Sequence, residues 1–305
     1  MTEVYHSGER EIQDIVGEAA IAARNGVVIK DTVIAGAINF IEKQPMAIVG
    51  SQNNEGEIWT SLLIGKFGFA KVPNPNTIVF DRNSVSSNPA DLFYTNIQQH
   101  NQIGSLFIEF DRRRRFRING TCQWQGSQIE VKVNEAYPNC PKYIQRRIAL
   151  LPEYINKVAS TTVEGTELSA DGISWIRNAD TFFVGSSSKD GRLDVSHRGG
   201  NPNFIEVMSN GALKIPDYSG NSLYNTLGNI LQNPNVGLLF IDFEKGHTLQ
   251  LTGKAGLLFD QKAEVDFIKT KGTGRFWIFN TSRYIHTLNH HHVDWRFLDY
   301  SPFNP

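Results

Sequence analysis

A stretch in the second half of the chain, DVSHRGGNPNF, brings together side chains that can bind an anion. Ser196, His197 and Arg198 supply a hydroxyl, an imidazole and a guanidinium, and Gly199 and Gly200 follow directly. A guanidinium offers planar, bidentate donors to a phosphate group, while glycines let backbone amides come close to a ligand. These residue types allow a phosphate-type site, although most stretches of this kind are turns. The alternative is a glycine-rich strand end that carries an exposed arginine.

A second polar cluster occurs in IPDYSGNSLYNTLGN (215–229). Its residues Asp217, Ser219 and Asn221 are turn formers that can cap the helix expected after them. A helix N-terminus is also a natural anion site, because its first N–H groups are free and its dipole is positive there. Capping and anion binding both stay open for this cluster.

Two further patterns are not expected to be sites. Four arginines in DRRRR (111–115) lie at a predicted hairpin turn, and without interleaved aromatic residues they favour a solvated tip over a nucleic-acid contact. The three histidines of LNHHHVD (288–294) point to alternate faces of an extended chain, so at most two can share a metal ion. No nearby residues complete a convincing ligand set, and no metal site is expected.

The composition indicates a soluble, cytoplasmic protein. The 305 residues carry 30 Lys and Arg against 31 Asp and Glu, so the chain lacks the basic excess that attracts nucleic acid. Cys122 and Cys140 are too few for a disulfide framework. The N-terminus lacks a signal-peptide pattern, and no run of about 18 apolar residues indicates a membrane span. No nucleotide-binding fingerprint or catalytic triad is recognisable, so catalysis by side chains alone is not indicated.

The chain contains an internal repeat. Residues 60–72 align with residues 195–207 at a constant offset of 135, which pairs Ser61 with Ser196. Residues 103–121 align with residues 236–254 at an offset of 133. Repeats of this length are duplicated domains rather than solenoid units.

The elements within each repeat predict a mainly β fold. In the second copy, VGLLFIDF and TLQLTGKA are strand patterns joined by the turn EKGH, which predicts a β-hairpin, and SLYNTLGNILQ (222–232) has helical spacing. Strands, one helix and a long hairpin in this order predict an antiparallel sheet closed into a β-barrel with helices. A further helix is expected over 9–26, ending at Asn25-Gly26.

These patterns predict four regions. They are an N-terminal helical segment packed on the first barrel (1–45), a degenerate first barrel (46–134), a helical connector (135–164) and a cofactor-binding second barrel (165–305). Copy one has Leu62-Leu63-Ile64 where copy two has His197-Arg198-Gly199. Duplication lets one copy keep the structure while the other keeps the chemistry, so the second copy is expected to bind the ligand.

Several motifs resemble a known family. SHRGGNPNF, PDYSGNSLYNTLGN, NPNVGLLFIDFEKGHTLQLTG, IEFDRRRRFRINGT and NCPKYIQRR are similar to motifs of the pyridoxamine 5'-phosphate oxidase-like FMN-binding proteins, within the subgroup that has two tandem split barrels. The resemblance implies antiparallel split barrels with FMN at the barrel–barrel interface, in an arrangement that is usually a homodimer. Two copies in one chain could supply that interface internally.

The resemblance also implies a set of cofactor-binding residues. Ser196, His197 and Arg198 would lie along the flavin and its ribityl phosphate, and the second cluster would approach the phosphate. The full set is Ser196, His197, Arg198, Gly199, Gly200, Asp217, Asn221, Asn225 and Thr226. Where the oxidases of the family carry a Ser-Arg-Lys series on the following helix, this chain has Tyr224-Asn225-Thr226, so two phosphate-facing cations are missing.

The function that follows from the resemblance is an FMN-dependent oxidoreductase. The flavin would perform the redox chemistry, and NAD(P)H or a separate reductase would supply electrons. The alternative is a non-catalytic split-barrel protein that binds FMN or another planar ligand such as haem. Catalytic residues cannot be assigned from the sequence, and no membrane or nucleic-acid partner is expected.

Overall fold

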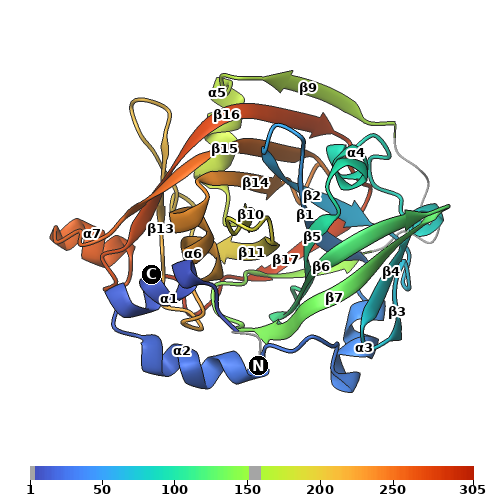
Figure 1. Cartoon of the computed structure of the whole chain (residues 1–305). Helices are drawn as coiled ribbons and strands as arrows, with labels where there is room; N and C mark the ends of the chain where they lie inside the picture. Colours follow the sequence, from blue (N-terminus) through green and yellow to red (C-terminus); the bar gives the residue numbers. More distant parts are fainter. Residues whose placement is uncertain (1–3, 151–158) are drawn as a thin grey trace.

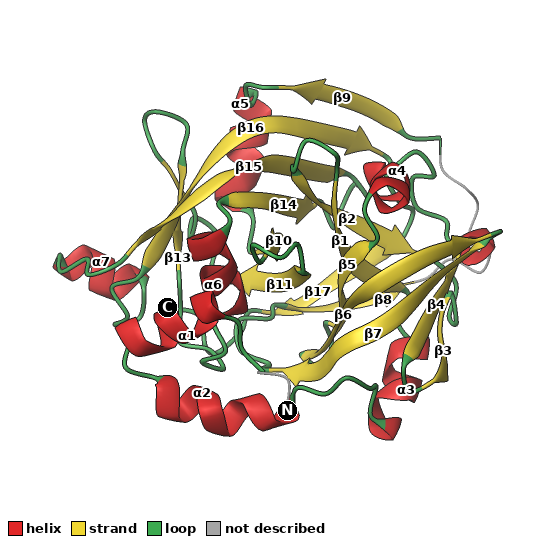
Figure 2. Cartoon of the chain, in the orientation of Figure 1, coloured by secondary structure: helices red, strands yellow, loops and turns green. Residues whose placement is uncertain are grey.

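A computed structural model of the chain describes residues 4–150 and 159–305, in which two large antiparallel sheets lie side by side (Figures 1 and 2). The first sheet has the strand order β2-β1-β5-β6-β7-β4-β3. Its strands are β1 (Met46–Gln52), β2 (Ile58–Ile64), β3 (Ala70–Asn74), β4 (Thr77–Asp81), β5 (Gln102–Glu109), β6 (Arg114–Gln125) and β7 (Gln128–Asn139).

The second sheet repeats this order strand for strand, as β11-β10-β14-β15-β16-β13-β12. Its strands are β10 (Thr181–Ser187), β11 (Leu193–Gly199), β12 (Glu206–Val207), β13 (Leu213–Pro216), β14 (Asn235–Ile241), β15 (Thr248–Leu258) and β16 (Phe276–Leu288), with β9 (Thr161–Gly165) paired to β16. The register also repeats, since Val49 pairs with Ser61 in the first sheet and Val184 with Ser196 in the second. The predicted mainly β, antiparallel fold with two copies is confirmed.

Helices join or cover the strands. Helix α4 (Leu92–Gln99) and helix α6 (Asn225–Gln232) occupy equivalent positions, each before the fifth strand of its sheet. The remaining helices are α1 (Ser7–Ile15), α2 (Ala19–Asn25), η1 (Gly26–Val28), α3 (Ala35–Glu42), η2 (Arg82–Ser84), α5 (Ala170–Asn178) and α7 (Glu264–Lys269). None of the helices in the described residues is long and apolar enough to cross a membrane.

The N-terminal segment contacts both halves, which corrects the prediction that it packs on the first barrel. Helix α3 does so through Ala37 and Ile41, but Ile12 of α1 belongs to the core of the second half. Figure 1 shows α1 beside α6. The helix expected over 9–26 is interrupted at Gly17, whose φ of 71° is a left-handed conformation that ends α1.

The predicted helical connector is wrong over its described residues. Strand β7 continues to Asn139, and no helix forms in residues 140–150 or 159–164. Instead, β8 (Arg146–Leu150) pairs with β17 (Asp294–Asp299) near the C-terminus, and β9 pairs with β16. The rest of the prediction, residues 151–158, lies outside the described residues. Helical spacing of apolar residues is a local signal, whereas these strands are stabilised by partners far away in the sequence.

A third apolar core joins the two halves within the chain. Strand β1 alternates, so that Ala47 and Val49 face the core of the first half while Met46 and Ile48 face the second half. Gly237 permits this close packing, because a Cβ at that position would lie 2.5 Å from the carbonyl oxygen of Ile58. The barrel–barrel interface is therefore intramolecular.

Candidate functional site

A cavity of about 100 Å³ opens between the two halves. Strand β11 supplies Ser196, His197, Arg198 and Gly199, and the segment before and at the start of α6 forms a second wall. That wall includes the predicted residues Asp217, Asn221, Asn225 and Thr226. The first half contributes Arg115, Arg117, Asn139, Cys140, Lys142 and Tyr143. Of the nine residues predicted from the sequence, only Gly200 does not line the cavity.

Arg117 of β6 forms the fixed, positively charged floor of this cavity. Its side chain is 5 % exposed and forms an ion pair with Asp194 at 3.1 Å. It also donates to the Ser196 hydroxyl at 2.5 Å and to the Asn225 Oδ1 at 2.8 Å. Burial opposes the charge, but the Asp194 carboxylate outweighs burial and raises the pKa of Arg117 above its usual value. Arg117 therefore stays charged and ties the two halves together.

Arg198 differs because its guanidinium has no hydrogen-bond or ion-pair partner among residues 4–150 and 159–305, and its Nε is buried. Burial lowers the pKa of Arg198, the Asp217 carboxylate partly offsets this, and the charge of Arg117 lowers it further. A partly buried cation that forms no ion pair is costly unless a ligand supplies the counter-charge. Arg198 is therefore the group in this cavity best placed to bind an anion.

His197 stays neutral at physiological pH. Its ring is 3 % exposed and packs edge-on against Phe183, with centroids 5.5 Å apart, and its Nδ1 lies 3.2 Å from a guanidinium nitrogen of Arg115. Burial, together with the charges of Arg115 and Arg198, lowers the pKa of His197 well below its usual range. The Nε2 atom has no partner within the described chain. His197 can thus form a neutral hydrogen bond to a ligand but does not add positive charge.

Arg115 is held at the edge of the cavity by the first half. It donates to the carbonyl oxygen of Cys140, and burial lowers its pKa to about 9. Its Nε is buried and lacks a partner in the described residues. Arg115 therefore remains mostly charged at neutral pH and loses its charge in alkaline solution.

Helix α6 points an uncapped N-terminus at the cavity. No side chain caps this helix, and the preceding residue Tyr224 has a left-handed φ of 61°. Of the two possibilities left open for Asp217, Ser219 and Asn221, capping of this helix is not observed. Asn221 instead accepts from the N–H of Leu223, and Asp217 pairs with Arg275 at 3.1 Å. The first N–H groups of α6 therefore keep the positive dipole end available to an anion.

The two polar side chains at the start of α6 bind other parts of the protein. Thr226 donates to the Ser196 hydroxyl at 3.1 Å. Asn225 accepts from Arg117 and donates to Glu9 at 2.5 Å. These contacts position the wall of the cavity, and the roles expected of both residues toward a phosphate remain predictions.

The glycine pair has a packing role. A Cβ at Gly199 would lie 2.1 Å from the carbonyl oxygen of Tyr143, so only glycine lets the first half approach this strand. Gly200 donates its N–H to the carbonyl of Asp180 at 3.1 Å and sits behind the cavity. The close approach is therefore to the protein backbone at Gly199 and to the Phe204 side chain at Gly200.

The predicted solvated arginine tip is only partly right. Arg112 and Arg114 are exposed, with side-chain exposures of 69 % and 53 %, but Arg115 lines the cavity. Arg115 and Arg117 are two residues apart on β6 and therefore share one face of the strand. The alternation in RRRRFR could have predicted that Arg115 and Arg117 lie on the same face of a strand. It could not have predicted which residues of the other half they contact.

The equivalent position in the other half is closed. Gln250 aligns with Arg117 and makes the matching contacts, to the carbonyl of Thr60 at 3.0 Å and to the Ser61 hydroxyl at 2.9 Å. Leu62 stands where the ligand-facing half has His197, and His290 is fully buried with its Nε2 2.8 Å from the Leu62 carbonyl oxygen. Packing thus replaces the open, charged cavity on this side.

No protein-family model matches the sequence, and no curated protein matches it. Solved structures similar to part of the chain include a HupZ variant from Group A Streptococcus, with 11 % identity over 39 % of this chain and 99 % of that chain, at a TM-score of 0.33. A pyridoxamine 5'-phosphate oxidase-related, FMN binding protein from Nostoc punctiforme has 9 % identity over 44 % of this chain and 100 % of that chain, at a TM-score of 0.31. A FAD-binding protein from Mesorhizobium loti has 13 % identity over 43 % and 98 %, also at 0.31. The name of the Nostoc punctiforme protein is that of the family that the sequence motifs resemble.

Proposed function

We propose that the chain binds FMN in the cavity between its two halves and holds the phosphate with Arg198 and the N-terminus of α6. The observation that carries this proposal is the guanidinium of Arg198, which has no partner among the described residues. The cavity is also lined by Arg115, Arg117 and Lys142, whereas Asp217 is already paired with Arg275. An excess of positive charge with an uncapped helix end favours a phosphate ligand.

The residues of the cavity fit this cofactor. A volume of about 100 Å³ accommodates a phosphate-sized group, and the buried Nε of Arg198 and Nε2 of His197 are donors without partners in the described chain. Tyr143 and Tyr218, whose ring centroids are 4.9 Å apart, line the same cavity and offer an aromatic surface to a planar ring. The fit supports a flavin phosphate better than a phosphate alone.

The activity that such a site supports best is flavin-dependent oxidation or reduction. A bound flavin supplies the redox chemistry, and the protein supplies binding, orientation and electrostatics. Arg198 would neutralise negative charge on the ligand. The hydrogen bonds of Ser196 with Arg117 and Thr226 hold the floor and the wall of the cavity in place. His197 is neutral, so its imidazole can form a hydrogen bond to the ligand without adding positive charge. Free NAD(P)H or a separate reductase would supply the electrons.

Binding without turnover is the second candidate. The lining side chains with shifted pKa values do not titrate close to pH 7, because the pKa of His197 is well below its usual range and those of Arg115 and Tyr143 are about 9 and 12. Such a cavity suits ligand binding as well as flavin chemistry. Consumption of NAD(P)H by the FMN-loaded protein with varied acceptors separates the two candidates.

The binding itself is tested by titration. We expect FMN to bind with a flavin spectrum between 300 and 700 nm, and riboflavin, which lacks the phosphate, to bind at least about tenfold more weakly. Sulfate should displace FMN, since it competes for the same donors. Equal affinity for FMN and riboflavin, or no binding of either, contradicts the proposal.

A further inference from the structure

An N-terminal arm, residues 4–25, packs against the wall of the cavity. This wall segment, residues 221–232, carries α6 and the turn before it. Hydrogen bonds join Ser7 to Gln232 at 2.7 Å, Glu18 to Tyr224 at 2.8 Å, and Asn25 to the carbonyl of Asn221 at 2.8 Å. The arm lies outside both repeats, yet it contacts the wall segment along most of its length.

The arm and the wall segment pack backbone against backbone. A Cβ at Gly8 would lie 2.3 Å from the carbonyl oxygen of Gly228, and a Cβ at Gly228 would lie 2.6 Å from the amide nitrogen of Glu9. At this contact no side chain separates the backbones of α1 and α6. A displacement of Glu9 is therefore transmitted to α6, whose N-terminus forms the anion-binding wall.

Glu9 connects the arm to the charges of the cavity. Its side chain is buried, one carboxyl oxygen accepts from the Asn225 amide at 2.5 Å, and the other accepts from the N–H of His6 at 2.9 Å. The Oδ1 of Asn225 in turn accepts from Arg117 at 2.8 Å. One side chain, Asn225, therefore separates Glu9 from the fixed cation of the site.

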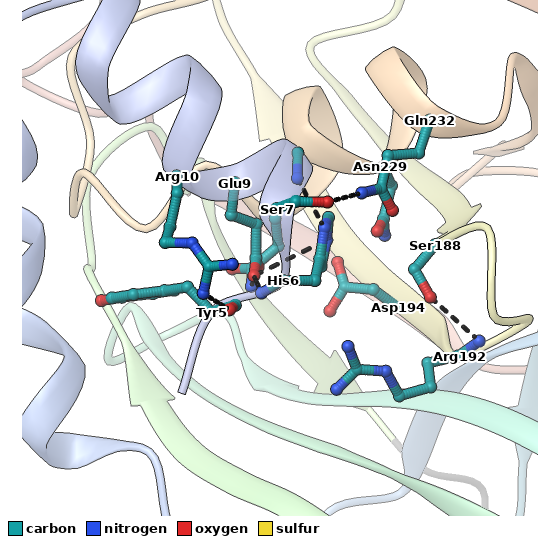
Figure 3. Close-up of polar contacts among 12 residues, drawn as sticks. Tyr5, His6, Ser7, Glu9, Arg10, Ser188, Arg192, Asp194, Asn229 and Gln232 are labelled. Atoms are coloured by element: carbon teal, nitrogen blue, oxygen red, sulfur yellow. Dashed lines mark hydrogen bonds and ion pairs between the residues drawn. The ribbon is translucent and has the colours of Figure 1, made fainter. Parts of the chain in front are cut away.

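The surroundings of Glu9 disfavour its ionised form. Figure 3 shows Glu9 and His6 of the arm facing Asp194 and Arg192 of the second half. The pKa of Glu9 is raised to about 8, mainly by burial and also by the carboxylates of Glu135 and Asp194, while the hydrogen bonds from His6 and Asn225 oppose the rise. The titratable and charged groups around it are Tyr5, His6 and Arg10 on the arm, Arg117 and Glu135 in the first half, and Arg192 and Asp194 in the second half.

We propose that Glu9 is a positioning residue that links anion binding in the cavity to the uptake of a proton by the arm. The proposal rests on the proposed function, because it needs an anion at Arg198 and α6. Neutral Glu9 holds Asn225 and Arg117 in the arrangement described above. Ionised Glu9 places a negative charge at the first turn of α6, where it competes with the ligand for the positive helix end and for Arg117.

The sign of the linkage follows from the charges. An anion in the cavity makes ionisation of Glu9 less favourable. At a pH where Glu9 is ionised in the ligand-free protein, anion binding is therefore accompanied by protonation of Glu9. Affinity for an anion should therefore fall as the pH rises through about 8, by at most about tenfold per pH unit. Burial keeps His6 and Tyr5 neutral in this range, since it lowers the pKa of His6 and raises that of Tyr5 to about 12. Arg115 also loses charge near pH 9, so wild type alone does not isolate Glu9.

The test compares wild type with Glu9→Gln, which removes the ionisable group, keeps one acceptor oxygen for the Asn225 amide and leaves Arg115 intact. FMN affinity is measured by fluorescence quenching from pH 6.5 to 9.5, a range in which the phosphate is a dianion above about pH 7. Sulfate, whose charge is constant over the whole range, serves as the competing probe. We expect the dissociation constants of the two proteins for FMN to agree within about twofold at pH 7.0. Between pH 7.5 and 9.0, the dissociation constant should rise by a factor at least about fivefold larger in wild type than in Glu9→Gln.

Parallel pH profiles in the two proteins overturn the linkage and leave the proposed function standing. If neither FMN nor sulfate binds wild type at pH 7.0, both proposals fail. A second measurement needs no variant: calorimetric titration of wild type with FMN at pH 7.5, where Arg115 is still charged and part of Glu9 is ionised, in two buffers of different ionisation enthalpy. Proton uptake supports the linkage, and identical heats in both buffers overturn it, even if Glu9→Gln does not fold.

Discussion

Replacing Arg198 by alanine separates ligand binding from folding. The guanidinium makes no hydrogen bond or ion pair to the described residues, so the substitution breaks neither kind of interaction within that part of the protein. Burial lowers the pKa of Arg198, which means that the folded state disfavours its charge. A base with a lowered pKa in the folded state reduces stability at neutral pH, and its removal relieves that cost.

Arg198→Ala should weaken FMN binding strongly but should not lower the free energy of unfolding. A hydrogen bond from a charged donor to a phosphate contributes about 1.5–3 kcal/mol, so Arg198→Ala should raise the dissociation constant for FMN by about 10- to 150-fold. The free energy of unfolding should change by less than about 0.5 kcal/mol or increase. Riboflavin affinity should change much less than FMN affinity, because riboflavin has no phosphate.

The matched control is Leu63→Ala at the equivalent position of the first half. Leu63 is 1 % exposed and belongs to the core of the first half, so its truncation should cost about 2–5 kcal/mol of unfolding free energy and leave FMN affinity nearly unchanged. Urea denaturation and flavin fluorescence titration measure the two properties on the same samples. A stable Arg198→Ala protein with wild-type FMN affinity would refute the assignment of the phosphate to Arg198. Loss of affinity in Leu63→Ala at full stability would refute the asymmetry between the halves.

Other parts of the site make further predictions. Arg117→Ala should lower the free energy of unfolding by about 3–5 kcal/mol, because it leaves Asp194 buried without its partner, and a urea midpoint equal to wild type would exclude this. Because burial raises the pKa of Glu9 from 4.5 to about 8, wild type should lose stability as the pH rises from about 4.5 to 8 and then level off. Glu9→Gln should remove that slope and be the more stable protein at pH 8, by up to about 4 kcal/mol, and identical pH dependences of the urea midpoint would contradict it. Cys140 lines the cavity and should react with iodoacetamide more slowly when FMN is bound, whereas Cys122 is buried and should stay unmodified; a Cys140 rate that ignores FMN would place the ligand elsewhere. One FMN should bind per chain, since the equivalent position is closed, and calorimetry that finds two would show otherwise.

Local patterns in the sequence were sufficient for the elements and for one side of the site. Alternating and β-branched residues predicted the hairpin that β14 and β15 form, and helical spacing predicted α6, although it begins at Asn225 rather than at 222. The repeat predicted two copies with the same strand order. The adjacency of Ser196, His197 and Arg198 on one strand placed three cavity residues together, because neighbours in sequence remain neighbours in space.

The tertiary structure decided everything that depends on which segments meet. Arg117 contacts Ser196 from 79 residues away, and Arg115 contacts His197 from 82 residues away, because the third apolar core packs the two halves against each other. Glu9 accepts a hydrogen bond from Asn225, 216 residues away in the sequence. The close approach of Gly8 and Gly228 brings α1 and α6 together, and no periodic pattern in the sequence indicates it. The sequence by itself determined the strands, the repeat and the chemistry of one wall, since these follow from local spacing. Packing between distant segments determined the opposite wall, the closed second position and the partner of Glu9, since burial and charge pairing depend on contacts that local spacing does not specify.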